Sequence, residues 1–414
     1  MATIFLYHIS YASGSQALIS NLDFINDKHQ FFVANLHPLD RDTSLTAKCG
    51  IPVNGRDQSR VVCEISTQKV PLESLGTSTT MCKVALPENE AERIASKSPN
   101  IFPMMRSVAL QYLNERNVIM NWKEIVRSEV YVKVVIVDLL KCKLKELTFK
   151  ADPDNYIYSN VLTYKDNTFD VLAASSNSSC GAKKCRINFD ERGEEIYPRF
   201  PINTNARIVQ TTYVIDSDNE KNFFLLSLNP DFTHKLMHFG QSGTQTFFTT
   251  LPPTSIYPIP TSNANKKYAS CTTSLEPRCF QFTAAGDLIM NHTIKTENKF
   301  SKLIGVHNVA EGGILVLTTT CPSFHLSVYK CQDFWVKKVN QDGKYGQSMK
   351  IVEKDFACDF YRGTMGVSVI ENENEICFNL VCVFEQKSHL ADEITRTGYT
   401  FLSNCTSQTS IRKL

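Results

Sequence analysis

Short apolar runs rich in Val, Ile, Phe, Tyr and Thr follow one another along the chain, with turn-forming residues between them. Such runs are typical of β-strands, because branched and aromatic side chains pack well on a pleated surface. Only Glu88–Ser96 and the shorter Leu390–Thr395 favour a helix. The pattern therefore predicts an all-β protein. Its expected strands include Ile4–Tyr11, Phe31–Leu36, Val108–Leu113, Tyr131–Leu140, Ile208–Ile215, Phe223–Leu228, Gly313–Thr319 and Ile376–Phe384.

A polar tetrad that begins with Asn or Asp recurs between these strands. Asn or Asp can open a turn by bonding to its backbone, and Gly or Asn tolerates the left-handed position that closes it. The tetrads begin at residues 26, 114, 190, 229 and 340, with a weaker copy at 284. Gaps of 39 to 56 match one four-stranded unit, and gaps of 76 and 88 match two. Further turns at Thr67-Gln68 and within Val135–Phe149 would fill the long gaps.

The repeat resembles that of β-propeller proteins, and of WD40-like families in particular. The resemblance implies a single propeller domain over residues 1–414, with about seven four-stranded blades and six to eight compatible with the spacing. The chain lacks the Trp-Asp and Gly-His signatures of that family, and its two tryptophans are Trp122 and Trp335. Two β-sandwiches, or a barrel joined to a sandwich, are the alternative.

A propeller joins its first and last blades, since exposed strand edges invite aggregation. We expect the N-terminal and C-terminal strands to close the ring in one shared blade. These strands are Ile4–Tyr11, Val367–Ile370, Ile376–Phe384 and Tyr399–Leu402.

Composition sets further limits on the class of protein. With 42% hydrophobic and 21% charged residues among 414, the chain can bury a core and is neither collagen-like nor disordered. Its net charge of +2 gives no global attraction to nucleic acid, which is therefore not expected as a direct ligand. The apolar run Val132–Val137 is far shorter than the roughly 20 residues of a membrane span.

Fourteen cysteines are scattered along the chain without a C-x-x-C pair, which argues against a structural zinc site. Several lie in strand-like runs, where cysteine acts as a small hydrophobe. We therefore expect mostly free thiols and an intracellular protein, cytoplasmic or nuclear. Residues 1–13 lack the basic start of a signal peptide and favour a strand. A secreted, disulfide-bonded protein is the competing interpretation, with which the N-x-[ST] sequons at Asn177, Asn291 and Asn404 are compatible.

Motifs for chemistry are absent from the sequence. It contains no phosphate-binding glycine loop, no H-E-x-x-H and no G-x-S-x-G. His234 and His238 have a ligand spacing only on a helix, and their segment favours a strand. Glu371–Glu375 is read as a polar turn. We accordingly predict no catalytic residue, no cofactor, no metal and no small-molecule ligand.

Four residues are candidates for binding a partner. Lys141, Lys143 and Lys145 alternate with apolar residues, so a strand would carry all three on one face. They form either a basic stripe for an acidic partner or an outer strand protected from edge pairing. Trp335 is either an exposed anchor or part of the core between blades.

The sequence thus favours a non-catalytic propeller scaffold that binds proteins within a multi-subunit assembly. One alternative is a propeller-fold glycoside hydrolase or lyase, which would need two acidic residues about 5–10 Å apart at the central channel. The other is a secreted or viral-surface β protein that binds a receptor or a glycan.

Overall fold

The structure is a computed structural model that describes part of the chain. The described residues are 16–19, 24–26, 33–38, 43–50, 62–69, 79–87, 109–126, 129–151, 161–164, 166–174, 180, 184–202, 207–213, 223–228, 234–240, 245–251, 259–261, 267–272, 276–283, 287–296, 301–309, 312–320, 330–346, 348–352, 358–359, 366–371, 374–387 and 395–413.

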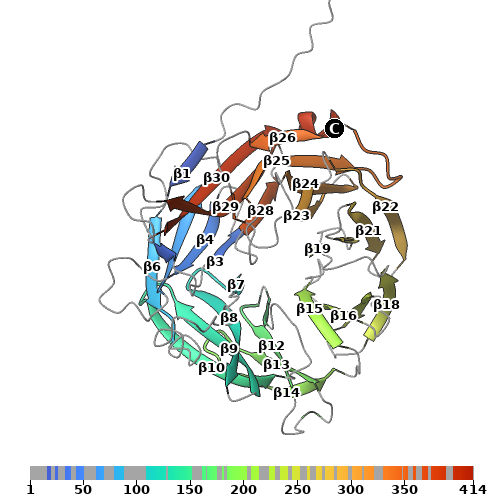
Figure 1. Ribbon diagram of the computed structural model, residues 1–414. Coiled ribbons are helices and arrows are strands. Elements are labelled where there is room, and N and C mark those ends of the chain that lie inside the picture. Colours follow the sequence, from blue (N-terminus) through green and yellow to red (C-terminus); the bar gives the residue numbers. More distant parts are fainter. Residues whose placement is uncertain are drawn as a thin grey trace, which may run out of the picture.

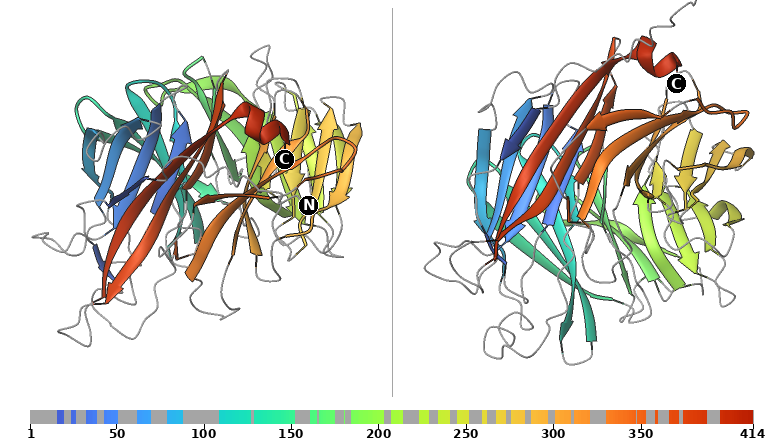
Figure 2. Two further views of the ribbon diagram at one scale, coloured as in Figure 1. Left: turned by 90° about the horizontal axis from the view of Figure 1, so that it is seen from above. Right: turned by 45° about the horizontal axis from the view of Figure 1, so that its top comes forward.

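These residues form seven separate antiparallel sheets of four or five strands, which stand around a common centre (Figure 1). Figure 2 shows that the strands of successive sheets run across the thickness of this arrangement, so the turns gather at two faces. The predicted all-β class is confirmed, and the architecture is propeller-like. In the part of the chain described, no helix is long and apolar enough to cross a bilayer.

The sheets are numbered here by their order along the chain. Sheet 1 contains β3 (Val33–Pro38), β4 (Thr43–Gly50), β5 (Val62–Lys69) and β6 (Thr79–Ala85). Sheet 2 contains β7 (Ala109–Tyr112), β8 (Asn117–Val126), β9 (Glu129–Asp138) and β10 (Lys143–Ala151). Sheet 3 contains β11 (Val161–Thr163), β12 (Phe169–Ala174), β13 (Lys184–Phe189) and β14 (Glu195–Pro201). Sheet 4 contains β15 (Arg207–Tyr213), β16 (Phe223–Leu228), β17 (His234–Phe239) and β18 (Gln245–Leu251).

The remaining three sheets follow the same meander. Sheet 5 contains β19 (Ile259–Thr261), β20 (Lys267–Cys271), β21 (Arg278–Thr283) and β22 (Leu288–Thr293). Sheet 6 contains β23 (Ser301–Asn308), β24 (Ile314–Thr320), β25 (Lys330–Val339) and β26 (Met349–Val352), with β27 (Cys358–Asp359) paired to β25. Sheet 7 contains β28 (Gly366–Glu371), β29 (Glu375–Lys387) and β30 (Thr395–Ser407), and the helix α2 (Gln408–Lys413) follows β30.

Two N-terminal strands also belong to sheet 7. Both β1 (Gln16–Ile19) and β2 (Phe24–Asn26) pair antiparallel with β30, so the two ends of the chain share one sheet. The three late strands lie together as predicted. Residues 4–11, which we expected to join them, lie outside the described residues, as do the helix candidate 88–96 and most of 390–395.

The apolar faces explain why the sheets stand side by side. In β9, Val135 and Val137 pack towards sheet 1, and Val134 and Ile136 pack towards sheet 3. Because side chains alternate along a strand, a continuous apolar run buries both faces of its sheet. Sheet 6 repeats the arrangement: its β24 packs one set of side chains against sheet 5 and the alternate set against sheet 7.

Polar side chains are buried at the junction of sheets 7 and 1. Strand β3 contacts β28 and β29 there. Leu45 and Ala47 point towards sheet 2, so Thr46 and Ser66 lie on the opposite face of sheet 1. Both are buried, and their hydroxyl oxygens are 2.8 Å apart. On β29, the buried Asn379 alternates with side chains that pack on sheet 6. This junction therefore includes buried polar side chains.

The predicted tetrads at 114, 190 and 340 are turns, but they do not mark one repeated hairpin, and the tetrads that begin at 26, 229 and 284 lie mostly or wholly outside the described residues. Asp190 and Asn340 open turns between the third and fourth strands of their sheets, whereas Asn114 opens a turn between the first and second. A third-to-fourth turn also lies within Val135–Phe149, as predicted. Thr67-Gln68 is not a turn, because β5 runs through it. Turn chemistry marks any tight hairpin, so the spacing alone could not assign each turn to a position.

The prediction of mostly free thiols is wrong for ten cysteines. Within the described residues they form five disulfides. Three of these bonds join directly opposed residues of neighbouring strands, a relation that strand register creates and sequence spacing does not reveal. The pairs are Cys49–Cys63, Cys82–Cys142, Cys180–Cys185, Cys271–Cys279 and Cys377–Cys405.

Replacing Gly193 tests the packing of sheet 3 on sheet 2. Gly193 has a φ of +74°, and a Cβ there would lie 2.6 Å from Cδ1 of Ile136. We expect Gly193→Ala to lower the free energy of unfolding by roughly 2–3 kcal/mol through backbone strain and overpacking. Ile136→Val removes Cδ1, so Gly193→Ala should cost about 1 kcal/mol less in that background. Urea unfolding of the four proteins measures the coupling, and additive costs within about 0.5 kcal/mol would contradict this contact.

Candidate protein-binding surface

Three turns meet at the junction of sheets 2 and 3, on one of the two faces where turns gather. They connect β7 to β8, β9 to β10 and β13 to β14. The first and third connections of an antiparallel meander lie at the same end of the sheet, which brings the first two turns together. The third belongs to the neighbouring sheet and packs beside them through Gly193. We call this set the turn surface: residues 113–117, 138–142 and 190–194.

Each turn is held by the side chain of its opening residue, which accepts hydrogen bonds from two backbone amides further along. This Asx capping fixes the turn backbone without tertiary contacts. The bonds run to Asn114 Oδ1 from the amides of Arg116 (3.0 Å) and Asn117 (2.8 Å), to Asp138 Oδ1 from Leu140 (3.0 Å) and Lys141 (3.1 Å), and to Asp190 Oδ1 from Arg192 (2.9 Å) and Glu194 (2.8 Å).

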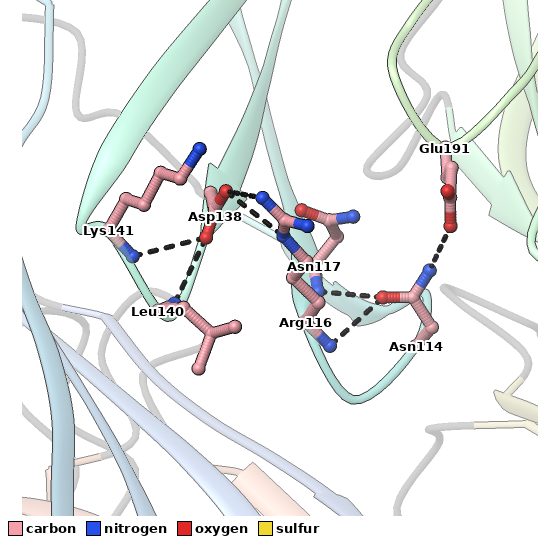
Figure 3. Close-up of polar contacts among 7 residues, drawn as sticks. All are labelled: Asn114, Arg116, Asn117, Asp138, Leu140, Lys141 and Glu191. Atoms are coloured by element: carbon pink, nitrogen blue, oxygen red, sulfur yellow. Dashed lines mark hydrogen bonds and ion pairs between the residues drawn. The ribbon is translucent and has the colours of Figure 1, made fainter.

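An ion pair joins the first two turns. The Arg116 guanidinium donates to Asp138 Oδ2 at 2.8 and 3.1 Å, while the other carboxylate oxygen accepts the turn amides (Figure 3). The hydrogen bond from Arg116 lowers the pKa of Asp138, and the same bond raises the pKa of Arg116. Both groups therefore stay charged at neutral pH, and the Asp138 carboxylate organises two turns at once.

The turns of sheet 2 are also tied to sheet 3. The Asn114 amide donates to Glu191 at 2.9 Å (Figure 3). The Lys145 ammonium donates to the carbonyl of Arg192 at 2.7 Å and to Glu194 at 2.6 Å. These contacts are exposed and each contributes little by itself. Together they fix the relative position of the two turn-bearing sheets.

A cluster of buried polar and charged side chains joins the strands of sheet 3. Asp170 accepts hydrogen bonds from the Arg186 guanidinium, the Tyr164 hydroxyl and the Asn188 amide, the last at 2.8 Å. Burial raises the pKa of Asp170, and the Arg186 charge opposes that rise. A buried carboxylate with three donors has its hydrogen-bonding capacity met within the fold, so this cluster holds the sheet together.

The turn at residues 138–142 has one further restraint and one exposed apolar residue. Cys142, which has a φ of +50°, forms a disulfide with Cys82, so the turn is anchored to sheet 1 as well as to Arg116 of its own sheet. Leu140 at its tip is 76% exposed, and Figure 3 shows its side chain pointing away from the network. Leu140 is therefore an exposed apolar side chain on a restrained turn, with charged side chains beside it.

Only two of the three lysines that were predicted to share one strand face lie in a strand. Lys141 lies in the turn before β10, and Lys143 and Lys145 lie in the strand. Lys145 bonds to the turn of sheet 3, so its ammonium group is engaged within the fold. Lys141 and Lys143 are exposed next to Leu140, so both are placed where a partner bound at the turn surface would meet them.

Trp335 lies far from this surface along the chain, in β25 of sheet 6. It is half-buried, and the Lys350 ammonium lies 5.5 Å from the centre of its ring. Lys350 is also paired with Asp333 at 3.0 Å. The indole face is thus covered by a neighbouring side chain, and Trp335 does not join the other three candidate residues.

Carboxylates are scarce on the innermost strands that the structure describes. The first strand of each meander is β3, β7, β11, β15, β19, β23 or β28, and Glu371 of β28 is the one acidic residue within these seven strands. Its carboxylate lies 3.5 Å from His307 Nε2 of the neighbouring sheet. The hydrolase alternative requires a second carboxylate that these strands do not supply.

Metal-ligating groups converge at one place in the described ranges, where Glu375 approaches Cys377 and Cys405. The two sulfurs are joined in a disulfide, so neither is a thiolate that could bind a metal. His234 and His238 lie on β17, which is a strand as predicted. Neither the disulfide-bonded cysteines nor these two histidines offer a site for a cofactor.

Comparison with known proteins gives no family. No family model matches the chain, and no curated protein matches it in sequence. Among solved structures, the chain is similar to the β-propeller domain of the Trilobed protease from Pyrococcus furiosus, with 9% identity, a TM-score of 0.34, and coverage of 67% of this chain and 78% of that one. A crystal structure of BBS1N in complex with ARL6DN is similar at 8% identity and a TM-score of 0.43, covering 91% and 97%.

A protein of unknown function from Bacteroides caccae is similar at 9% identity and a TM-score of 0.34, covering 59% of this chain and 78% of that one. With identities this low, such similarities say nothing of function. The description of this chain as propeller-like therefore rests on its own sheets.

The charge state of Asp138 can be tested by titration. A carboxyl whose folded pKa is depressed stabilises the fold above its unfolded pKa, near 3.8, and this contribution is lost as pH falls through the folded value. We expect the amide proton shifts of Leu140 and Lys141 to titrate with a midpoint below 3.8, and Asp138→Asn to abolish the titration. Measurement is by NMR on deuterated protein.

The Lys344 amide, which bonds to Asp342 in another turn, is the internal control and should titrate identically in both proteins. A midpoint at or above 3.8 for Leu140 would mean that Arg116 does not hold the Asp138 carboxylate.

Proposed function

We propose that the chain is a single propeller domain over residues 1–414 whose seven sheets are blades of a closed ring, and that it serves as a non-catalytic platform for protein partners in a larger assembly. The packing of both faces of sheets 2 and 6 supports the ring. The pairing of β1 and β2 with β30 supports closure by the two ends of the chain. A ring of this kind can hold several partners on two faces and a rim.

The observation that carries the binding function is the exposed Leu140 on a turn restrained by capping, an ion pair and a disulfide. An exposed apolar side chain on rigid backbone loses little conformational entropy when it is buried by a partner. Energetic hot spots of interfaces are apolar or aromatic anchors of this type surrounded by polar contacts.

The chemistry around Leu140 favours a protein partner. Arg116 and Lys141 lie in the turns of this surface together with the acidic Glu115 and Glu191, and Lys143 follows directly at the start of β10. Mixed charge around an apolar centre matches the polar rim of a protein interface. A nucleic acid would require a strong excess of positive charge, and the chain has a net charge of +2.

The five disulfides favour a binding protein that is secreted or displayed on a surface. Disulfides persist in oxidising compartments and are rare in the cytosol and nucleus. A secreted or viral-surface protein that binds a receptor or glycan is therefore the second candidate, and it would use the same rigid ring. The predicted intracellular location stays a prediction that no finding tests.

Substitution of Leu140 tests the binding surface. We expect wild-type protein purified from its native source to carry a partner, and Leu140→Asp to weaken titrated binding of that partner by at least roughly 30-fold, as for loss of a hot spot worth about 2 kcal/mol. Leu288→Asp is the matched control, since Leu288 is 49% exposed on β22 of sheet 5. Unchanged affinity of Leu140→Asp, or equal loss in the control, would refute the assignment.

The disulfide offers a test of rigidity. The double variant Cys82→Ser with Cys142→Ser replaces each sulfur by a hydroxyl of similar size, keeps Leu140 and the charged groups around it, and frees the turn from sheet 1. Ordering such a segment costs about 0.5–1.5 kcal/mol, so affinity should fall about two- to tenfold, measured by calorimetry well below the unfolding temperature. Wild-type affinity in a folded double variant would show that pre-organisation of this turn does not matter.

A further inference from the structure

We propose that Asn291 carries an N-linked oligosaccharide in the mature protein. The triplet Asn291-His292-Thr293 is an N-x-[ST] acceptor on β22, the outermost strand of sheet 5. Asn291 and Thr293 are both exposed. Sequons arise by chance, so the argument depends on two further observations: the geometry of this side chain and the compartment in which the chain folds.

The geometry leaves the reacting atom accessible. Oδ1 of Asn291 accepts a hydrogen bond from Arg278 Nε at 2.7 Å, which holds the amide group at the surface. The sugar is attached to Nδ2, and this nitrogen has no hydrogen-bond partner among the described residues. The folded chain can thus carry a glycan at Asn291 without loss of that bond.

The compartment is indicated by the cysteines. Ten of the fourteen are paired in disulfides in the described part of the chain, which requires folding where thiols are oxidised. Asn-X-Ser/Thr acceptors are modified in secreted proteins, which fold under the same conditions. The two observations are independent, since none of the disulfides involves β22.

Asn404 provides a control within the same molecule. It also begins a sequon, but it is 6% exposed, and its amide nitrogen donates to the carbonyl of Ile351 in the neighbouring sheet. The next residue, Cys405, is bonded to Cys377. A glycan on this nitrogen does not fit the fold, so the native protein should be modified at Asn291 and not at Asn404.

The modification is a group transfer whose donor is a lipid-linked diphosphate oligosaccharide. A bond forms between Asn291 Nδ2 and the anomeric carbon of the first sugar, while the bond from that carbon to a phosphate oxygen breaks. The lipid diphosphate leaves with the bonding electrons, and the one proton that the amide nitrogen loses passes to the solvent. No oxidant or reductant is consumed.

The position of Asn291 has two physical consequences. A bulky hydrophilic glycan on an outermost strand hinders edge-to-edge pairing with another sheet. Sheet 5 lies across the ring from sheet 2 (Figure 1), so the glycan would leave the turn surface open. The proposal does not depend on what binds at Leu140.

The test is made first on full-length protein from its native source. After reduction, the protein is treated with a glycan-removing amidase in water labelled with heavy oxygen, which converts a glycosylated Asn to labelled Asp, and is analysed by peptide mass spectrometry. We expect labelled Asp at position 291 and unlabelled Asn at position 404. An unmodified Asn291 in the native protein overturns the proposal.

Matched variants check that the acceptor triplet is responsible. Full-length chains behind a cleavable secretory leader are expressed in a eukaryotic cell as wild type, Thr293→Ser and Thr293→Ala. We expect Thr293→Ser to keep the mass shift on deglycosylation and Thr293→Ala to lose all of the shift that belongs to residue 291. A shift at 291 that survives Thr293→Ala would also overturn the proposal, because the modification would not use this triplet.

Discussion

The burial of apolar side chains on both faces of a sheet, seen in sheets 2, 3 and 6, is the constraint on which the rest of this structure depends. Strand β9 places Val135 on one side and Val134 on the other, and each buried valine contributes about 1.5–3 kcal/mol. Exposing one face of one sheet would therefore remove an energy comparable with the whole stability of a domain, about 5–15 kcal/mol. A row of such sheets has two unburied end faces unless its ends meet, and a ring is the arrangement in which they do.

The junction of sheets 7 and 1 shows that polar groups are also buried between the sheets. Thr46 and Ser66 lie there with Asn379, as the ion pair of Asp170 and Arg186 lies buried on the face of sheet 3 opposite to sheet 2. Polar groups gain little net free energy when they are buried, even when they are hydrogen-bonded. The pairing of β1 and β2 with β30 adds backbone hydrogen bonds to sheet 7. The rigid turn surface then follows, because turns keep fixed positions only if the sheets that bear them do.

Local chemistry could be predicted from the sequence, and long-range contacts could not. Phe223–Leu228 was predicted residue for residue, because branched and aromatic runs form strands wherever they pack. Turns were recognised from Asn, Asp and Gly, but their place within each sheet depends on pairing between distant strands. Cys49 and Cys63 are opposed only through strand register. Leu140 was taken as the end of a strand, although Asp138 two residues earlier already marks a capped turn. Lys145 was predicted to bind a partner. Its bonds to sheet 3 reach residues 47 and 49 positions away, and contacts between residues so far apart cannot be recognised in the sequence.

The most direct test of the closed ring is native-state hydrogen exchange of the two strands at opposite edges of sheet 7. If the N-terminal strands complete this sheet, the hydrogen-bonded amides of β1 (Gln16–Ile19) exchange in the same slow cooperative unit as those of β28 (Gly366–Glu371). Exchange of the β1 amides at the rate of unpaired chain, while β28 stays protected, would contradict the account, because the ring would then have an open edge between its first and last sheets.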